Sequence, residues 1–257
     1  MQQLALIADI HGNMEALRTV AHDIKQRGIT QIYCMGDMVG KGPQPGEVID
    51  WCRQNCAVVL LGNHEDYMLQ GTYFYPHVLE EIGKERLDWL ATLPLIHKMW
   101  ISGRRVCLLH GRPVAPLTGP FLTEQAIETM FKAVEEKDDL LDWVGYADIH
   151  RQIKCDFSAG SGKTLFNIGS VGSNYSEPLC SYTILKGELH SKEKSAFSFE
   201  YITLPYDNVA TAKLAQKSTW LPNKDDYLYE VLTGKYFLNR PHEKTAYWLK
   251  LLEEKEK

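Results

Sequence analysis

The sequence predicts a mixed α/β fold that begins with a mainly parallel sheet. Short apolar runs alternate with helix-like segments up to Leu61, which is typical of a βαβαβ unit. Alternating, antiparallel-type patterns follow from Gln152, and helix-like segments return from Pro205. We therefore expect residues 1–204 to form the main domain. Residues 205–257 are expected to form a helical C-terminal extension that packs on this domain or on a partner subunit.

The first part of the chain predicts strands and helices in strict alternation. Three short apolar strands are expected at Leu4 to Ala8, Ile32 to Met35 and Ala57 to Leu61. Apolar residues recur every three or four positions between Met14 and Ile24, which predicts a helix that stops near Gly28. A shorter helix is expected around Val48 to Arg53. Strands joined through helices in this way usually lie parallel in one sheet.

The remaining elements follow from the same two periodicities. A helix is expected over Pro76 to Leu93, with Gly83 as a weak point, and another over Thr123 to Lys137, where Thr123 can cap the N-terminus. Ile96 to Ile101 and Arg105 to Leu109 predict a hairpin. The later strands, expected as one β layer, are Ile153 to Phe157, Thr164 to Ile168, Ser181 to Leu185 and Phe197 to Leu204. The helices of the extension are expected at Val209 to Gln216, Tyr227 to Leu232 and Glu243 to Glu254.

Composition and charge argue against several classes of protein. The 257 residues, 44% of them hydrophobic, are enough for a well-developed core. A net charge of −5 and a pI near 6.0 argue against dedicated nucleic-acid binding and against binding to anionic membranes. The N-terminus lacks secretory features and no apolar run approaches a membrane span, so we expect a cytoplasmic protein. Six cysteines without a CxxC pair indicate reduced thiols.

Clusters of His, Asp and Asn follow several of the predicted strands. They are Asp9-Ile10-His11, Gly36-Asp37, Asn63-His64-Glu65, His110-Gly111 and Asp148-Ile149-His150. Carboxylate, imidazole and amide ligands without thiolate suit divalent Mn, Fe, Zn or Ni better than a structural zinc site. Two ions side by side need one carboxylate with both oxygens available to bridge them, and Asp37 is the natural bridge. His64 could then donate a proton to the leaving group, with Glu65 orienting its imidazole.

The order DxHGN, GDxVxxGP, GNHE, HG and a terminal xxH resembles the calcineurin-like metallophosphoesterases. The resemblance is strongest to small bacterial phosphodiesterases and diadenosine-tetraphosphatase-like members, and it extends over about residues 4–205. It implies a four-layer αββα sandwich and a site for two divalent metal ions, for which we favour Mn. It also implies that His64 is the proton donor. The ligands that the resemblance implies are Asp9, His11 and His150 for one ion, Asn63, His110 and residue 148 for the other, and Asp37 between them.

Position 148 departs from the pattern of this family. The family usually ends with Gly-His-x-His, whereas Asp148 stands here where an imidazole is expected. A carboxylate can still bind a hard divalent ion, so either a second ion is held with altered affinity or that ion is lost. Lys41 falls where related protein phosphatases have a phosphate-binding arginine. Lys41 and Arg112 are therefore candidates for contact with a substrate phosphate, although a lysine lacks the bidentate geometry of arginine.

These observations predict a binuclear phosphoesterase that hydrolyses phosphodiesters or dinucleoside polyphosphates by attack of a metal-bridging water. A phosphomonoesterase acting on a phosphoprotein or a metabolite is one alternative, because GDxV and GNHE also resemble protein phosphatases. A metal-binding scaffold with weak activity is another, if Asp148 has led to loss of the second ion. The expected partner is a phosphorylated small molecule or a nucleotide. A second copy of the chain is a further candidate, through the C-terminal extension.

Overall fold

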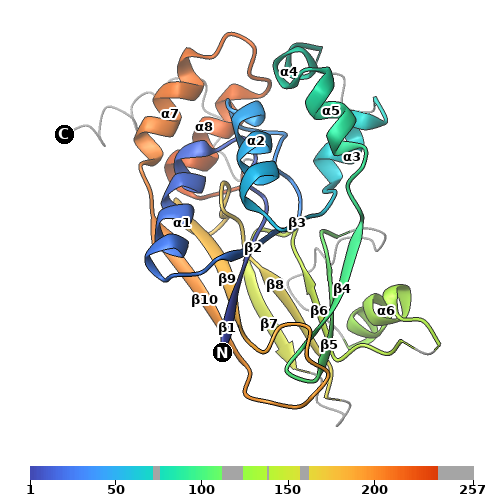
Figure 1. Cartoon of the computed structure of the whole chain (residues 1–257). Coiled ribbons are helices and arrows are strands. Elements are labelled where there is room, and N and C mark those ends of the chain that lie inside the picture. The colour runs from blue at the N-terminus through green and yellow to red at the C-terminus, as the bar shows by residue number, and fades with distance from the viewer. Residues whose placement is uncertain (72–75, 112–123, 138, 157–161, 237–257) are drawn as a thin grey trace.

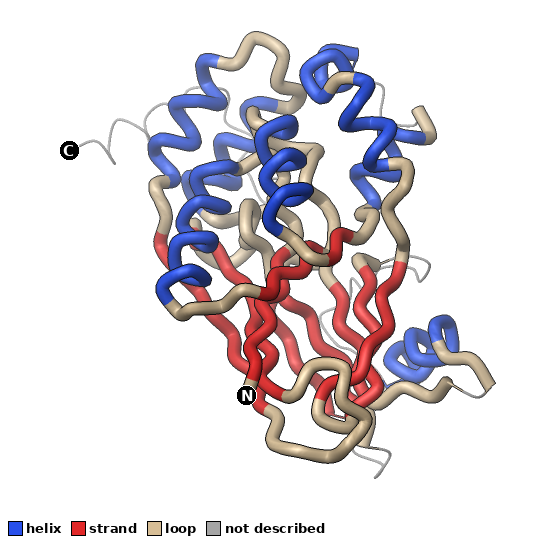
Figure 2. Tube along the Cα trace, in the orientation of Figure 1, coloured by secondary structure: helices blue, strands red, loops and turns tan. Residues whose placement is uncertain are grey.

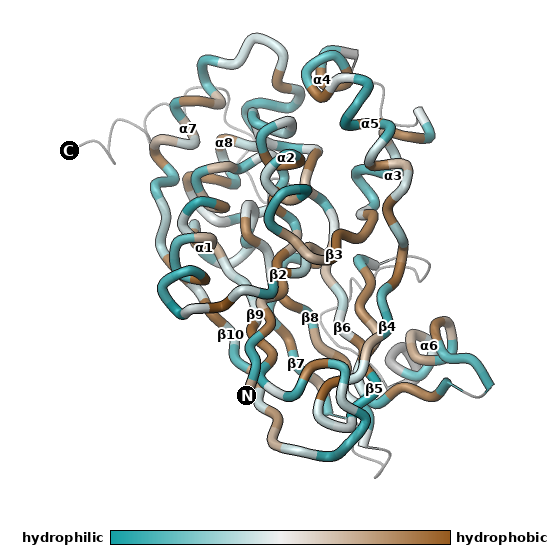
Figure 3. The backbone as a smooth tube through the Cα atoms, in the orientation of Figure 1, coloured by the Kyte–Doolittle hydropathy of each residue, from teal (hydrophilic) through white to brown (hydrophobic). Residues whose placement is uncertain are grey.

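The structure is a computed structural model that describes residues 1–71, 76–111, 124–137, 139–156 and 162–236. Within these residues the chain forms two five-stranded sheets, in the orders β10-β9-β1-β2-β3 and β4-β5-β6-β8-β7 (Figure 1). Most of the helices gather toward one end of the sheets, and α6 lies apart from them (Figure 2). Hydrophobic and hydrophilic stretches alternate along the outer helices, as expected for elements that bury one face (Figure 3).

The first sheet is built from both ends of the described chain. β1 (Gln2–Ile7), β2 (Gln31–Cys34) and β3 (Val58–Val59) are parallel, as the βαβαβ pattern predicted. β9 (Leu179–Gly187) pairs antiparallel with β1, and β10 (Ser198–Pro205) pairs antiparallel with β9. β1 is therefore the central strand of this sheet. The residues that follow β1 lie in the middle of the edge where the parallel strands have their carboxyl ends.

The second sheet contains one strand that the sequence analysis missed. The hairpin of β4 (Ile96–Ile101) and β5 (Arg104–Leu109) was predicted, whereas β6 (Trp143–Tyr146) has only four residues, one of them glycine, and gives little periodic signal. β6 runs parallel to β5 and to β8 (Thr164–Ile168), and β7 (Gln152–Asp156) pairs antiparallel with β8. The prediction that the late strands form one β layer is wrong, because β7 and β8 join this sheet while β9 and β10 join the first.

The helices of the described residues are α1 (Met14–Gln26), α2 (Pro45–Asn55), α3 (Asn63–Leu69), α4 (Pro76–Ile82), α5 (Lys84–Leu90), α6 (Glu124–Val134), α7 (Asn208–Lys217) and α8 (Lys224–Thr233). The one helix expected from Pro76 to Leu93 is two helices. Gly83 separates them with a φ of +77° and forms the N-cap of α5. Glycine adopts such left-handed values without steric cost, which explains the break at this position.

Alternate residues of β1 enter two different cores. Leu4 and Leu6 pack between the two sheets, whereas Ala5 and Ile7 pack against α1 and α2. Helix α6 covers the outer face of the second sheet, where Phe131 is buried. The layers are therefore helix, sheet, sheet and helix, which is the four-layer αββα arrangement that the family resemblance implied.

The two C-terminal helices of the described chain pack against each other and share a core of their own. Helix α7 also contacts α1, so these helices lie on the same side of the first sheet as α1 (Figure 1). The helix expected from Glu243 to Glu254 lies outside the described residues. Within the described chain, no helix combines the length and the apolar character needed to cross a membrane.

Candidate metal centre

Each predicted ligand lies just after a strand or at the start of a helix that follows one. Asp9 and His11 follow β1, Asp37 follows β2, Asn63 and His64 begin α3, His110 follows β5, and Asp148 and His150 follow β6. Within each sheet these strands run parallel, so their carboxyl ends lie at one edge. The structure brings all of these residues together there.

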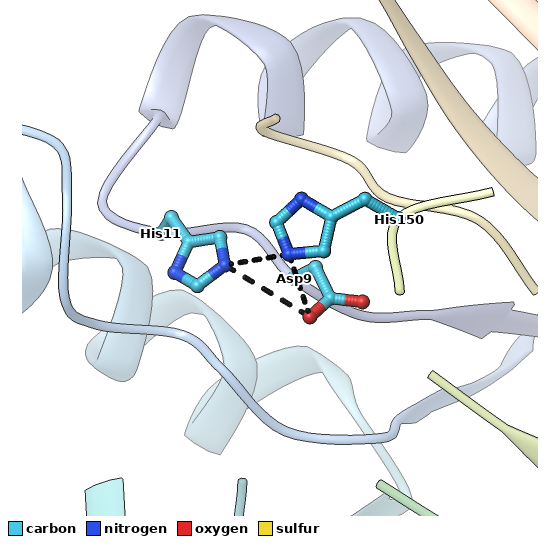
Figure 4. A group of neighbouring side chains, drawn as sticks. All are labelled: Asp9, His11 and His150. Atoms are coloured by element: carbon cyan, nitrogen blue, oxygen red, sulfur yellow. Dashed lines mark hydrogen bonds and ion pairs between the residues drawn. The ribbon is translucent and has the colours of Figure 1, made fainter. Parts of the chain in front are cut away.

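Asp9, His11 and His150 form one compact group of possible ligands (Figure 4). The Oδ1 atom of Asp9 lies 3.4 Å from Nε2 of His150 and 3.9 Å from Nε2 of His11. The two Nε2 atoms are themselves 3.1 Å apart. All three side chains are buried, and each offers one atom toward the same point.

Asp37 lies between this group and a second one. Its Oδ2 atom is 3.3 Å from Nε2 of His110 and 3.8 Å from Nε2 of His11. Its other oxygen, Oδ1, accepts a hydrogen bond from the backbone N–H of His64 at 2.9 Å. Oδ2 therefore faces both groups, while Oδ1 is also held by the backbone.

The second group contains His110, Asn63 and Asp148. Oδ1 of Asn63 lies 2.8 Å from Nε2 of His110, and Oδ1 of Asp148 lies 4.0 Å from the same nitrogen. The amide nitrogen of Asn63, placed the other way round, would lie 3.2 Å from Asp148 Oδ1 and 3.1 Å from Asp37 Oδ2. In that orientation the Asn63 amide donates to these neighbours, and in the other its oxygen is turned toward the same point.

The imidazoles of His11, His110 and His150 are all oriented in the same way. Each Nδ1 atom donates its hydrogen to a backbone carbonyl; the acceptors are Val39, Met35 and Ser173, respectively. Because a carbonyl can only accept, the proton of each neutral ring lies on Nδ1 and the Nε2 lone pair points inward. This orientation through an outer hydrogen bond is usual for histidines that bind metal ions.

In the group of Asp9, His11 and His150, the inward-facing atoms have no proton to share between them. Nε2 of His11 and Nε2 of His150 face each other as two acceptors, and the buried Oδ1 of Asp9 has no hydrogen-bond partner among the described residues. Buried acceptors left in this state are costly unless a donor or a cation satisfies them. The described side chains therefore fit divalent cations bound to nitrogen and oxygen ligands.

Burial and charge shift the pKa of four proposed ligands, His11, Asp37, His110 and Asp148. Although burial acts to lower it, the pKa of His110 is raised well above its ordinary value by the negative charges of Asp37, Asp9 and Asp148. Burial raises the pKa of Asp148 to about 6, and the charges of Asp9 and Asp37 act in the same direction. Burial also lowers the pKa of His11 well below its usual range. A neutral imidazole is the form that binds a metal ion, and the carboxyl group must release its proton to do so.

The backbone of the centre is unusual. Among the described residues, eight that are not glycine have a positive φ, and five of them are predicted ligands: Asp9, His11, Asp37, Asp148 and His150. Such conformations are uncommon outside glycine and collect at functional sites, where surrounding contacts hold them. This enrichment supports a functional role for the loops, although Asp and His are also the types that adopt such values more often than most.

Glu65 holds the loop that carries Asp37. One carboxylate oxygen of Glu65 accepts hydrogen bonds from the backbone N–H groups of Asp37 and Gly62, each at 2.9 Å, and the other accepts from Val39 at 3.0 Å. The sequence analysis expected Glu65 to orient His64; its carboxylate is instead bound to the backbone. The three-residue spacing from Gly62 to Glu65 is that of the acidic half of a capping box, in which the carboxylate accepts from the N-cap N–H, and it could have indicated this contact.

The position of His64 depends on Gly40. The His64 ring lies edge-on to His11, with ring centroids 4.8 Å apart. Gly40 has a φ of +119°, and a Cβ atom there would lie 2.1 Å from Nδ1 of His64. Only glycine therefore lets the loop pass so close to the ring.

We expect Gly40→Ala to lower kcat by about a hundredfold, because the added Cβ must push His64 away from the centre. Steady-state hydrolysis of a diester would measure this effect. Gly28→Ala is the matched control, since Gly28 has a φ of +68° but no atom within 4 Å of the added Cβ. An unchanged kcat in Gly40→Ala would show that His64 need not lie where the structure places it.

Lys41 is held inside the protein. Its Nζ atom forms an ion pair with Glu230 of α8 at 3.0 Å and donates to Oη of Tyr175 at 2.6 Å and to Oγ of Ser173 at 3.4 Å. The sequence analysis predicted a contact between Lys41 and a substrate phosphate. In this arrangement a phosphate would have to compete with Glu230. Arg112, the other predicted contact, lies outside the described residues.

Comparison with known proteins points to one family. The sequence profile of the calcineurin-like phosphoesterases matches residues 3–180. The chain is 36% identical over 139 residues to an uncharacterised protein of Methanocaldococcus jannaschii. The matched region covers 50% of this chain and 57% of that protein. It is 28% identical over 138 residues to a symmetrical bis(5'-nucleosyl)-tetraphosphatase of Paracidovorax citrulli, with 49% of each protein covered. The chain thus matches about half the length of these relatives.

A solved structure shares the fold of most of the chain. The crystal structure of a metallophosphoesterase from Sphaerobacter thermophilus superposes with a TM-score of 0.68 at 19% identity, covering 91% of this chain and 99% of the other. At this identity the similarity concerns the fold, and it extends beyond the matched profile into the C-terminal part of the chain. The four-layer arrangement described above is therefore shared with a protein of known structure.

Proposed function

This chain belongs to the calcineurin-like phosphoesterase family, and from this premise we propose that it is a metal-dependent phosphoesterase with water as the nucleophile. We propose phosphodiesters or dinucleoside polyphosphates as the substrates. The similarity to a symmetrical bis(5'-nucleosyl)-tetraphosphatase supports a nucleotide anhydride in particular. The observation that carries the proposal is the convergence of the buried acceptors of Asp9, His11 and His150, which have no proton between them, beside a second group of imidazole, carboxylate and amide side chains.

The arrangement supports binding of two divalent cations, with Mn as the first candidate. We propose Asp9, His11 and His150 as the ligands of one cation, Asn63, His110 and Asp148 as those of the other, and Asp37 as the ligand that both share. Two bound cations would lower the pKa of a water nucleophile toward neutrality and offset the charge that grows on the phosphoryl oxygens. The position of Asp37 Oδ2 between the two groups supports this assignment.

We assign the transfer of a proton to the leaving oxygen to His64. Its Nε2 atom lies 3.9 Å from Oδ2 of Asp37, and its side chain is 15% exposed, so a substrate can reach it. Burial lowers the pKa of His64, although the charge of Asp37 opposes this shift. A lowered pKa makes the protonated ring a stronger acid toward the leaving group, but it leaves a smaller fraction of the ring protonated at neutral pH.

The direct test is hydrolysis by chelator-stripped protein with and without added Mn²⁺. Three substrates separate the possible activities: bis(p-nitrophenyl) phosphate, p-nitrophenyl phosphate and diadenosine tetraphosphate. Mn-dependent cleavage of the first and the third would support the proposal. Cleavage of the monoester alone would favour a phosphomonoesterase, and tight Mn²⁺ binding without any hydrolysis would favour a scaffold.

Asp148 gives a separate prediction. We expect Asp148→Asn to weaken the binding of one of two Mn²⁺ ions and to lower hydrolysis, each by about ten- to a hundredfold, because a charged ligand is lost. Isothermal titration and diester hydrolysis would measure the two effects. Asp156→Asn, at a surface ion pair with Lys154, is the control.

The reverse substitution separates a working ligand from a lost one. Asp148→His introduces the imidazole that this family usually has at this position. If Asp148 is a working ligand, Asp148→His should leave hydrolysis similar or lower it. An increase by orders of magnitude would instead favour the scaffold with weak activity.

A further inference from the structure

Helix α8 of the C-terminal extension reaches the metal centre through a buried acid. Glu230 is 5% exposed, and its Oε2 atom accepts hydrogen bonds from Nζ of Lys41 at 3.0 Å and from Oγ of Ser173 at 3.1 Å. A carboxylate is seldom buried unless its charge is paired and its oxygens are hydrogen-bonded. Both conditions are met here by residues that belong to loops of the metal centre.

The partners of Glu230 hold His150 on two sides. The backbone carbonyl of Ser173 accepts the hydrogen of Nδ1 of His150. The ring of Tyr175 stacks on the ring of His150, with centroids 4.3 Å apart and planes inclined by 9°. Lys41 donates to Oη of that tyrosine, so the edge and the face of His150 are both fixed by residues that Glu230 binds directly or through Lys41.

The same extension contacts the loop that carries His11. The backbone N–H of Gly42 donates to the carbonyl of His11 at 2.6 Å, and a Cβ atom on Gly42 would lie 2.7 Å from Oη of Tyr227 in α8. Asn13, two residues after His11, is hydrogen-bonded to Oη of Tyr206 and to Oγ1 of Thr211, each at 3.2 Å. Residues after β10 therefore contact the loops of two proposed ligands.

We propose that Glu230 is a positioning residue of the metal centre, which holds His150 in its ligating orientation through Ser173, Lys41 and Tyr175. The C-terminal helices are then part of the site. This inference rests on the proposed function, because it assigns His150 to a cation. Outer hydrogen bonds of this kind fix the orientation of ligating histidines, and their loss usually weakens metal binding.

A purely structural role for Glu230 makes a different prediction. A buried ion pair that only anchors α8 would change the stability of the protein when it is disrupted, but it would leave the affinity for metal ions unchanged in a variant that still folds. Metal affinity at matched thermal stability therefore separates the two roles. The rate of hydrolysis alone would not separate the two roles, because misfolding also lowers that rate.

The test uses the full chain, stripped of metal and titrated with Mn²⁺ by calorimetry, with circular dichroism and thermal unfolding to monitor the fold. Glu230→Gln removes the charge, and Ser173→Ala removes only the hydroxyl that links Glu230 to the Ser173 backbone. In both variants we expect one of the two Mn²⁺ sites to weaken by about tenfold. Hydrolysis should recover at saturating Mn²⁺ with an unchanged KM for the diester. Glu200→Gln, on β10 in an ion pair with Lys186 of β9, should change none of these quantities.

The outcomes are distinct. Unchanged affinity at both sites in folded Glu230→Gln and Ser173→Ala would overturn the inference and leave the proposed function standing. If Glu230→Gln fails to fold, Ser173→Ala decides, because it keeps the ion pair between Lys41 and Glu230. If the unaltered chain binds no Mn²⁺ and hydrolyses no diester, the proposed function fails, and the inference fails with it.

Discussion

Replacing Asp37 with asparagine is expected to lower kcat/KM for a diester by on the order of a thousandfold or more. The reason is the position of this carboxylate, whose Oδ2 atom faces His110 at 3.3 Å and His11 at 3.8 Å, so that Asp37 would serve both proposed cations. An asparagine can still accept the hydrogen bond from the backbone of His64. It cannot supply the negative charge between the cations. Steady-state hydrolysis with Mn²⁺, together with metal titration, would measure both losses.

The control for Asp37→Asn is a carboxylate of the same type in a surface ion pair. Asp50 pairs with Arg86 at 2.6 Å and is 40% exposed, so Asp50→Asn should leave kcat/KM unchanged. Asp37→Asn should keep a native circular dichroism spectrum. A folded Asp37→Asn variant with activity within about tenfold of the unaltered protein would contradict a centre built around Asp37.

Replacing Glu65 with alanine is expected to lower the free energy of unfolding by about 3–5 kcal/mol. The buried carboxylate accepts three backbone hydrogen bonds, from Asp37, Val39 and Gly62, and alanine leaves all three N–H groups without this acceptor. Glu65→Gln should lower the free energy of unfolding by a smaller amount. One amide oxygen can still accept from two of the groups, while the amide nitrogen faces the third. Urea unfolding of the metal-free protein would give the two values.

The matched control for Glu65→Ala is Glu85→Ala. The side chain of Glu85 is 85% exposed and pairs with Arg53 at the surface, so its loss should change stability by less than about 0.5 kcal/mol. Similar values for the two alanine variants would show that the backbone of the Asp37 loop does not depend on Glu65. If Glu65→Ala folds at low temperature, its hydrolysis should also fall, because Asp37 is then less firmly held.

Much of the fold was predictable because its signals are local. The parallel order of β1, β2 and β3 follows from short apolar runs separated by helical periodicity, and both can be seen within about ten residues. Strand β6 could not be predicted, since four residues that include a glycine show no clear period. The placement of β9 beside β1 could not be predicted either, because an alternating pattern indicates a strand but not its partner.

By itself, the sequence determined the chemistry that the site can offer. The types and order of Asp9, His11, Asp37, His110 and His150, most of them placed after a predicted strand, indicated nitrogen and oxygen ligands at the carboxyl ends of strands. This was possible because side-chain chemistry and strand ends are local properties. The sequence also showed that position 148 departs from the family's motif, because a substitution within a motif is visible without a structure.

Only the tertiary structure decided how these side chains are held. Lys41 and Glu230 are 189 positions apart, and no local pattern connects a lysine in one loop with an acid in a late helix. The inward Nε2 atoms, the left-handed φ values and the stacking of Tyr175 on His150 likewise depend on which segments the two sheets bring together. Periodicity acts over one turn or one strand, whereas these contacts form only after the chain has folded, so they could be found only in three dimensions.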